Sequence, residues 1–259
     1  MPMNATKVRS AWVIVGSIAA VVTLGFGMVQ AIGFVAREQS TVRQSFPGAG
    51  LSLVEVTSDS GSIRVVGDDE ESVRVVIRLE EGWSRIERVA RVDGDRLVLS
   101  AACPVFSGPF CSATYEVHVP RRLDVVARSE NADVGASDVD GAVTAGSSNG
   151  DVTGTRLGGE AQLTTDNGSV EGVDLTSDDV VGSSSNGDVE LEMARAPRSV
   201  RAESDNGDVV VIVPRGSELY AVDATTDNGD AATPIRTDPS ARRRIVARSD
   251  NGDVTVRYP

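Results

Sequence analysis

The chain has 259 residues, of which 40% are hydrophobic and only 4% aromatic, so a core would be built mainly from Val, Ala, Leu and Ile side chains. Its formal net charge is −13 at pH 7. This acidity argues against nucleic acid as a partner, because phosphates require a basic surface, and against docking on anionic lipid headgroups.

The first element expected along the chain is a membrane-spanning helix. Ala11–Ala36 is a run of 26 residues without a charged side chain, and as a helix at about 1.5 Å per residue it would be about 39 Å long. Lys7 and Arg9 precede the run, which favours a cytoplasmic N-terminus. We therefore expect a cytoplasmic tail over residues 1–10, a transmembrane helix over residues 11–36, and a single-pass protein of the plasma membrane whose remainder is extracytoplasmic.

A cleaved secretory signal peptide is the alternative interpretation of this run. Val29, Gln30 and Ala31 would serve as a cleavage site with small residues. The apolar part would then be longer than the roughly 7–15 residues usual for a signal peptide, so an uncleaved anchor is favoured.

After the anchor we expect a linker over residues 37–49 and one extracytoplasmic domain over residues 50–259. The domain contains both cysteines of the chain, Cys103 and Cys111, in the segment CPVFSGPFC. An extracytoplasmic compartment allows such a pair to oxidise, so we predict a disulfide between them. A zinc site is disfavoured because two thiols and the single histidine, His118, fall short of four ligands.

The dominant feature of the domain is a repeat centred on Asn-Gly. Degenerate copies of the motif stand earlier in the chain, with Ala132 and Gly61 at the glycine position. Ser or Thr stands three residues before this position, and apolar or small residues stand five and seven before it and two after it. The period of two indicates strands. The pairs are Asn149-Gly150, Asn167-Gly168, Asn186-Gly187, Asn206-Gly207, Asn228-Gly229 and Asn251-Gly252, spaced by 18, 19, 20, 22 and 23 residues.

Two all-β folds would explain the repeat. Asn-Gly is a strong signal for a two-residue hairpin turn, which would give an antiparallel hairpin meander. A unit of 18–23 residues in which every offset recurs is more typical of a solenoid, whose equivalent residues stack about 4.8 Å apart in parallel ladders. We therefore predict an all-β parallel β-solenoid or β-roll of such coils, with Asn side chains hydrogen-bonded along the stack.

The repeats also resemble a known family. The pattern resembles the bacterial β-strand-repeat domains called "putative adhesin". In both, a strand, the motif Ser-x-Asn-Gly-Asp-Val and a second strand are repeated behind one apolar segment. The resemblance covers residues 51–258, includes the segment YEVHVP at residues 115–120, and departs from the family in the Cys103–Cys111 loop. It implies an extended β-solenoid on the cell envelope, with adhesion or envelope-stress roles and no catalytic residues. Asn-Gly-Asp followed by Val is intact at Asn149, Asn186, Asn206 and Asn251.

The last three repeats carry Asp-Asn-Gly-Asp, which raises the question of a bound cation. Stacked in register, their six carboxylates would lie along one edge and repel one another unless solvent or a cation relieves the charge. Calcium prefers such oxygen ligands, so these residues are weak calcium candidates. The alternative is that Asp simply favours turns by bonding its own backbone. The candidates are Asp205, Asp208, Asp227, Asp230, Asp250 and Asp253.

The expected function is a binding or structural role at the cell envelope, without catalysis and without a firm cofactor. The expected partners are the membrane, through the N-terminal helix, and an envelope or surface ligand. A regulatory or sensing partner of an envelope-stress system is one alternative, and a carbohydrate-active β-helix enzyme is another. The enzyme is disfavoured because almost every Asp occupies a turn position and His118 stands alone in a predicted strand, so no nucleophile–base pair can be singled out.

Overall fold

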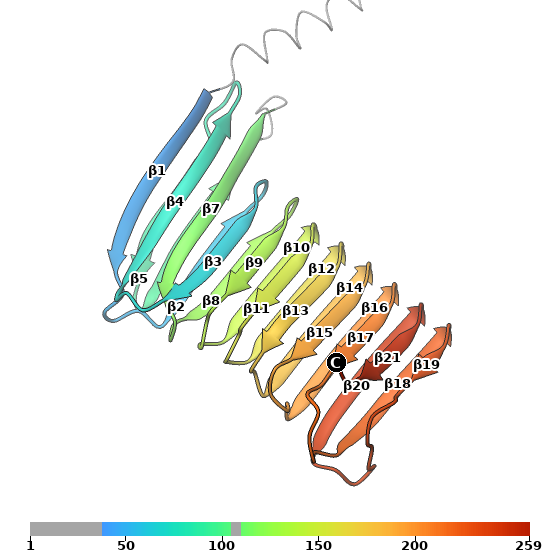
Figure 1. Cartoon of the computed structure of the whole chain (residues 1–259). Coiled ribbons are helices and arrows are strands. Elements are labelled where there is room, and N and C mark those ends of the chain that lie inside the picture. The colour runs from blue at the N-terminus through green and yellow to red at the C-terminus, as the bar shows by residue number, and fades with distance from the viewer. Residues whose placement is uncertain (1–37, 105–109) are drawn as a thin grey trace, which may run out of the picture.

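The computed structural model describes residues 38–104 and 110–259 of the chain. These residues form two β-sheets that lie face to face along an elongated stack (Figure 1). Among them, no helix is long and apolar enough to cross a membrane. The helix predicted over residues 11–36 lies outside the described residues and stays a prediction, whereas the all-β prediction is confirmed for the described part.

The two sheets are named A and B, and the strands of each follow in spatial order. Sheet A consists of β1 (Glu38–Pro47), β4 (Ser72–Glu81), β7 (Cys111–Pro120), β3 (Ile63–Asp68), β9 (Val134–Ser137), β11 (Val152–Thr155), β13 (Val170–Leu175), β15 (Val189–Met193), β17 (Val209–Ile212), β21 (Val254–Arg257) and β19 (Ala231–Ala232). Sheet B consists of β18 (Tyr220–Asn228), β20 (Arg243–Asn251), β16 (Ser199–Asn206), β14 (Asp179–Asn186), β12 (Ala161–Asn167), β10 (Val143–Asn149), β8 (Asp124–Ser129), β2 (Leu53–Ser58), β6 (Arg96–Ala102) and β5 (Glu87–Asp93).

Each repeat is one coil, with the strand before Asn-Gly in sheet B and the strand after it in sheet A. Equivalent residues pair in parallel register, so that Val143 of β10 lies between Val125 of β8 and Ala161 of β12. The degenerate copy at Gly61 joins the same stack, since β2 pairs with β8 and β3 with β9. The parallel solenoid is therefore confirmed. The hairpin meander is wrong for the repeats, because Asn-Gly turns the chain from one sheet to the other.

A thin apolar layer between the sheets forms the core. Buried and outward-facing residues alternate along the strands, as the period of two predicted. Leu157 and Leu163 are fully buried, and a Cβ atom added to Gly154 would lie 2.9 Å from each of them. The glycine thus makes room for two leucines, which explains how a core with few aromatic side chains packs densely.

The last coils do not stack in sequence order. Strand β20 lies between β16 and β18, and β21 lies between β17 and β19, so the final coil is inserted before the penultimate one. The two connections on either side of the penultimate coil, residues 213–219 and 233–242, are long enough to skip one position and return. The second connection also covers the start of β18 at the sheet edge, where Asp238 N–H donates to the Tyr220 carbonyl at 2.9 Å.

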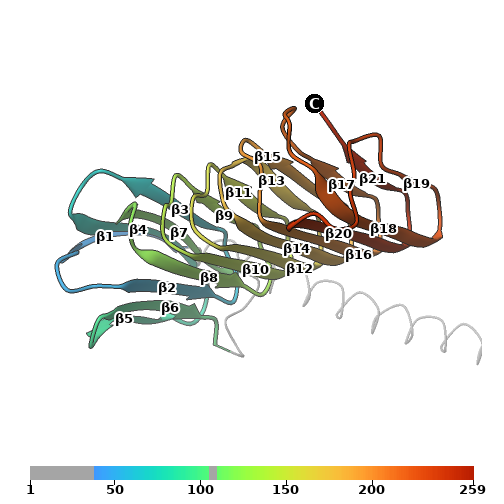
Figure 2. The ribbon, with the colours of Figure 1, turned by 90° about the horizontal axis from the view of Figure 1, so that it is seen from below.

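The N-terminal end of the stack is antiparallel. Strands β1, β4 and β7 pair antiparallel in sheet A, as do β5 and β6 in sheet B, and Figure 2 shows them as the two layers at this end. The expected linker over residues 37–49 is therefore corrected, because it contains β1, which pairs with β4 along its whole length. Val42 and Phe46 explain the difference, since both pack against the core and so favour an ordered strand.

The predicted disulfide is confirmed. Cys103 and Cys111 are bonded, with their Cα atoms 5.9 Å apart. Cys103 follows β6 of sheet B and Cys111 begins β7 of sheet A. The bond therefore ties the two sheets together at the N-terminal end of the stack.

Candidate functional site

The Asn-Gly corners form a continuous ladder of hydrogen bonds along the edge of the stack. Beyond Asn131, which begins the ladder, the Nδ2 atom of each asparagine donates to the Oδ1 atom of the asparagine in the adjacent coil at 3.1–3.2 Å, as predicted. Each Nδ2 also donates to a backbone carbonyl of that adjacent coil, for example Asn206 to Ser185 at 3.1 Å. In spatial order the ladder contains Asn131, Asn149, Asn167, Asn186, Asn206, Asn251 and Asn228.

Two further side chains bond each corner to its neighbour. The buried Ser or Thr three residues before the glycine donates its hydroxyl to a backbone carbonyl of the adjacent coil, as Ser184 does to Gly168 at 2.7 Å. The Asp after the glycine accepts a backbone N–H of the next coil, as Asp188 does from Asp208 at 2.8 Å. The corner residues are therefore fixed to one another by the stack itself.

Glycine is required at these corners because the coils approach closely. A Cβ atom added to Gly187 would lie 2.1 Å from the carbonyl oxygen of Gly168, and one added to Gly207 would lie 2.3 Å from that of Gly187. Separations under 3 Å are not tolerated between a carbon and a backbone oxygen. The sequence pattern predicts glycine here for the geometry of the turn. The structure adds a second reason, which is the close contact between neighbouring coils.

The six calcium candidates fall into two rows on this edge. Asp208, Asp253 and Asp230 form the row after the glycine. Asp208 and Asp253 each accept a backbone N–H of the adjacent coil, at 2.8 and 2.9 Å. The exposed row before the asparagine consists of Asp205, Asp250 and Asp227. Across the part of the chain that the structure describes, no group of three or more His, Cys, Asp or Glu residues is arranged to hold a metal ion.

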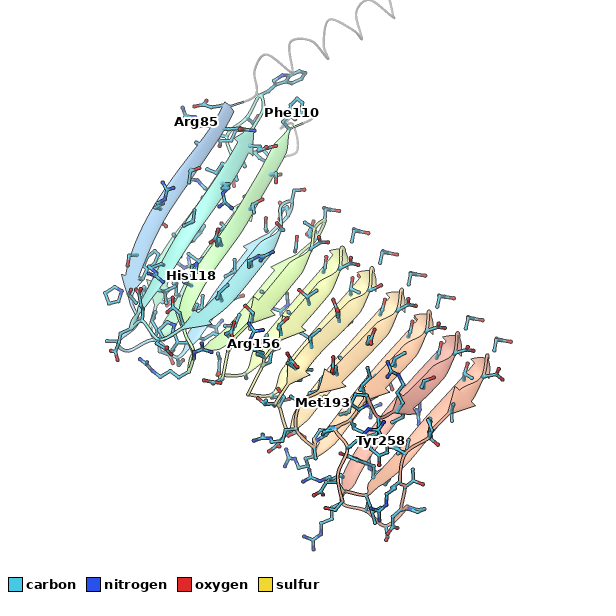
Figure 3. The ribbon with its side chains drawn as sticks, in the orientation of Figure 1. Arg85, Phe110, His118, Arg156, Met193 and Tyr258 are labelled. Carbon is cyan, nitrogen blue, oxygen red and sulfur yellow. A yellow bond between two sulfur atoms is a disulfide. The ribbon has the colours of Figure 1, made fainter. Side chains whose placement is uncertain are left out.

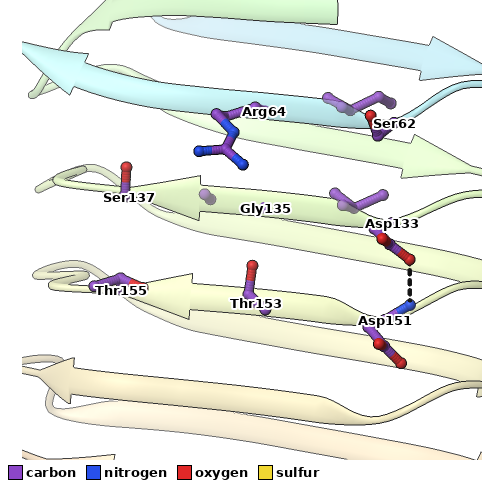
Figure 4. Close-up of a pocket in the computed structure, with 11 residues that line it drawn as sticks. Ser62, Arg64, Asp133, Gly135, Ser137, Asp151, Thr153 and Thr155 are labelled. Atoms are coloured by element: carbon purple, nitrogen blue, oxygen red, sulfur yellow. Dashed lines mark hydrogen bonds between the residues drawn. The ribbon is translucent and has the colours of Figure 1, made fainter. Parts of the chain in front are cut away.

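A different surface, the outer face of sheet A, carries a polar groove. A hollow of about 380 Å³ lies over β3, β9 and β11 (Figure 4). Its floor is low because the outward residues there are small: Gly135 pairs with Thr153, and Ser137 pairs with Thr155. Arg64, which pairs with Gly135 across β3 and β9, forms one wall.

The groove continues toward β7 and β4. A second hollow of about 320 Å³ shares Ser62 and Arg64 with the first and reaches Arg78 and Glu116. Arg78 donates to the Glu116 carboxylate at 3.1 Å. We refer to the two hollows together as the Arg64 groove.

Charged groups at this end of the groove are paired with one another, except for Arg64. The imidazole of His118 lies 3.5 Å from both Glu116 and Asp68, and its hydrogen bond, with that of Arg78, lowers the pKa of Glu116. Within the described residues Arg64 has no ion pair or hydrogen bond of its side chain, and it is exposed. Its guanidinium is therefore available to an anionic group.

The coils from Leu123 onward match a family model named Toastrack DUF4097, which covers residues 123–257. This is more than half of the chain. The chain belongs to the Toastrack DUF4097 family. No curated protein matches it.

Two solved structures similar to this Toastrack DUF4097 chain are each described as a "putative adhesin". A crystal structure of a "putative adhesin" from Bacteroides fragilis NCTC 9343 is 16% identical, covers 85% of this chain and 97% of its own, and superposes with a TM-score of 0.45. One from Parabacteroides distasonis ATCC 8503 is 12% identical, with the same coverages and TM-score.

Sequence reasoning found the corners of the Toastrack coils but missed the Arg64 groove. The signal was available, because Gly135 and Thr153 occupy the same offset in successive coils, three residues after the glycine position, as Ser137 and Thr155 do at five residues after it. Outward positions with small side chains in adjacent coils predict a depression on the face of a sheet. The pairing of Arg64 with Gly135 follows once the Gly61 copy is aligned with the others.

Proposed function

We propose that the protein is a membrane-anchored, extracytoplasmic binding module with an adhesin-like role at the cell envelope. Residues 11–36 would anchor it in the plasma membrane with residues 1–10 in the cytoplasm. The solenoid would display its polar faces to acidic polymers of the envelope. Its role would be binding rather than catalysis.

The observation that carries the proposal is the exposed Arg64, unpaired among the described residues, beside a floor of small and hydroxyl-bearing side chains. A guanidinium presents a planar fork of N–H donors that matches a carboxylate or sulfate through two hydrogen bonds. Thr153 and Ser137 add hydroxyls within the same hollow, which suit the hydroxyls of a sugar. An acidic polysaccharide offers both groups, so we propose it as the ligand class, with one anionic group recognised locally at Arg64 although the chain as a whole is acidic.

The carboxylates in the groove support binding rather than hydrolysis. A glycoside hydrolase needs two carboxyl groups free to act on the same bond. In this groove Asp133 accepts the backbone N–H of Asp151 at 3.0 Å (Figure 4). Asp151 in turn accepts the backbone N–H of Ser169 at 2.8 Å. Both are engaged in holding coils together.

The test is binding of the full chain in detergent micelles to polygalacturonate, with neutral dextran as the uncharged probe. Loss of a charge-assisted pair costs about 1.5–3 kcal/mol, so Arg64→Ala should weaken binding roughly 10-fold to 100-fold. Arg64→Lys keeps the charge but loses the planar fork of donors. Its affinity for polygalacturonate should lie between that of the parent chain and that of Arg64→Ala.

Arg128→Ala is the matched control, because Arg128 is an exposed arginine on β8 of the opposite sheet. It changes the net charge equally and should leave the affinity within about twofold. Equal weakening by both variants, or none by Arg64→Ala, would show that the groove does not bind the polymer.

A further inference from the structure

The antiparallel strands bring three segments together at one end of sheet A. Glu38, the first residue of β1, pairs with Glu81 at the end of β4, and Glu81 pairs with Cys111 at the start of β7. Neighbouring strands lie about 4.8 Å apart, so Cys111 is about 10 Å from Glu38. We refer to this edge, with the β4–β5 loop that follows Glu81, as the Glu38 end.

The Glu38 end is tied to the apolar run by chain connectivity alone. Ala36 ends the run of uncharged residues, and only one residue separates it from Glu38. A chain advances at most about 3.6 Å per residue, so the two Cα atoms lie within about 7 Å of each other. If the run crosses a bilayer, the Glu38 end must be at the bilayer surface.

Trp83 is an exposed aromatic side chain at this end. It lies in the β4–β5 loop and is 53% exposed, more than any other large hydrophobic residue that the structure describes. The loop itself is fixed, because Ile86 is buried and its N–H donates to the Glu81 carboxylate at 2.8 Å. Figure 3 shows Arg85 of the same loop and Phe110, next to the disulfide, at this end of the domain.

A partner for Trp83 must be partly apolar and partly polar. The indole ring combines a large apolar body with one N–H donor, and such rings concentrate where hydrocarbon meets headgroups. The lipid interface meets this requirement and, because the chain joins the Glu38 end directly to the apolar run, is the surface nearest to the loop. The overall acidity of the chain does not oppose the contact with a zwitterionic bilayer, because a covalent anchor supplies the local concentration that a basic patch would otherwise provide.

We infer that Trp83 inserts into the interfacial region of the bilayer and seats the Glu38 end on the membrane. The inference rests on the proposed membrane anchoring. Trp83 would fix the tilt of the stack against the membrane, so that the solenoid projects from it in one orientation.

The test is quenching of tryptophan fluorescence by lipid. The chain has two tryptophans, Trp12 in the apolar run and Trp83, so Trp12→Phe isolates Trp83 and Trp83→Phe isolates Trp12. Each full-length variant is reconstituted in phosphatidylcholine nanodiscs in which part of the lipid is brominated on acyl carbons 6 and 7. A third variant, Trp12→Phe/Trp83→Phe/Arg242→Trp, places the probe at an exposed position far from the Glu38 end.

The inference predicts that bromination lowers the emission of Trp83 by at least one third and leaves that of the Arg242→Trp variant unchanged. Quenching of Trp12 without quenching of Trp83 would overturn the inference and leave the anchoring intact. Absence of quenching at both Trp12 and Trp83 would overturn the anchoring as well. Equal quenching of Trp83 and of the Arg242→Trp probe would show non-specific contact with lipid and would also overturn the inference.

Discussion

Arg156 and Asp138 form a bidentate ion pair between neighbouring coils, with Nε 2.8 Å from Oδ1 and Nη2 2.7 Å from Oδ2. Both residues have positive φ, 51° and 61°, at the corner of the coil opposite Asn-Gly. Such a backbone conformation is uncommon for residues other than glycine, and Asp tolerates it better than Arg does. The ion pair therefore stabilises two corners whose backbone is strained.

The pair predicts a pH-dependent contribution to stability. Hydrogen bonding and charge attraction from Arg156, with a smaller contribution from Arg121, hold the pKa of Asp138 below its ordinary value. A carboxyl whose pKa is lower in the folded state contributes stability above its unfolded-state pKa, about 4, and loses it as the pH falls through the folded-state pKa. We expect Asp138→Asn, which tolerates the same φ, to lower the free energy of unfolding by about 0.5–1 kcal/mol at pH 7.

The difference in free energy of unfolding between the parent chain and Asp138→Asn should shrink below about pH 4 and vanish near pH 2. Urea unfolding of both full-length proteins at each pH measures it. Asp140→Asn is a suitable comparison, since the structure gives this neighbouring side chain no ion pair among the described residues. A difference for Asp138→Asn that is constant from pH 7 to pH 2 would contradict the role of the charge.

Substitution of Gly187 by alanine is expected to cause a severe packing defect at the Asn-Gly corner. In Gly187→Ala the new Cβ would lie 2.1 Å from the backbone oxygen of Gly168, so two coils must separate. Overpacking against backbone costs about 1–3 kcal/mol or more, and loss of the adjacent ladder bonds adds to it. Thermal unfolding should show a lower melting temperature for this variant.

Gly216→Ala is the matched control for that substitution, because its Cβ would have no atom nearer than 4.0 Å. It should leave the melting temperature within about 2 °C. If Gly187→Ala and Gly216→Ala have the same melting temperature, close approach between coils is not the reason for glycine at the corner.

The register of the repeats was predictable because one pattern encodes it many times. Val143, Ala161 and Val180 share an offset from the glycine, and they pair in the structure. A shift of one residue would turn every buried side chain outward. Local alternation and the period of the repeat therefore determine the same pairing.

The order of the last coils could not be predicted in this way. Val200, Val222 and Ile245 have the same offset, so a stack in either order satisfies the same register. The orders differ in which coil closes the stack: Ile245 and Val254 are buried in the inner coil, whereas Ala231 of the end coil is exposed. The antiparallel strand β1 was missed for a related reason, because the repeat does not extend to it and Pro47-Gly48 is typical of a linker.

Replacement of Tyr115 by phenylalanine is expected to stabilise the folded state. Its side chain is 1% exposed, and its hydroxyl has no hydrogen-bond partner within the described part of the chain. Burial raises its pKa to about 12, so the hydroxyl stays neutral but unsatisfied. Since a buried polar group without a partner costs about 1–3 kcal/mol, Tyr115→Phe should raise the free energy of unfolding by up to about 1 kcal/mol.

Tyr258→Phe should have the opposite sign, because the Tyr258 hydroxyl accepts the backbone N–H of Arg236 at 3.2 Å. Urea unfolding of both variants beside the parent chain measures the two effects. A loss of stability in Tyr115→Phe as large as that in Tyr258→Phe would mean that the Tyr115 hydroxyl has a favourable partner.

The aspartate rows predict that calcium has little effect on stability. Asp208 and Asp253 already accept backbone N–H groups, so coordination would compete with bonds that hold the coils together, while the exposed row is open to water. A specific site would raise the free energy of unfolding by about 2.7 kcal/mol at a hundredfold excess of calcium over its Kd. We expect the melting temperatures in about 5 mM calcium and in chelator to agree within about 1 °C at equal ionic strength. A clear rise in calcium that Asp250→Asn abolishes would instead establish the exposed row as ligands, because this variant removes one charge from the middle of that row and leaves the ladder of backbone bonds in place.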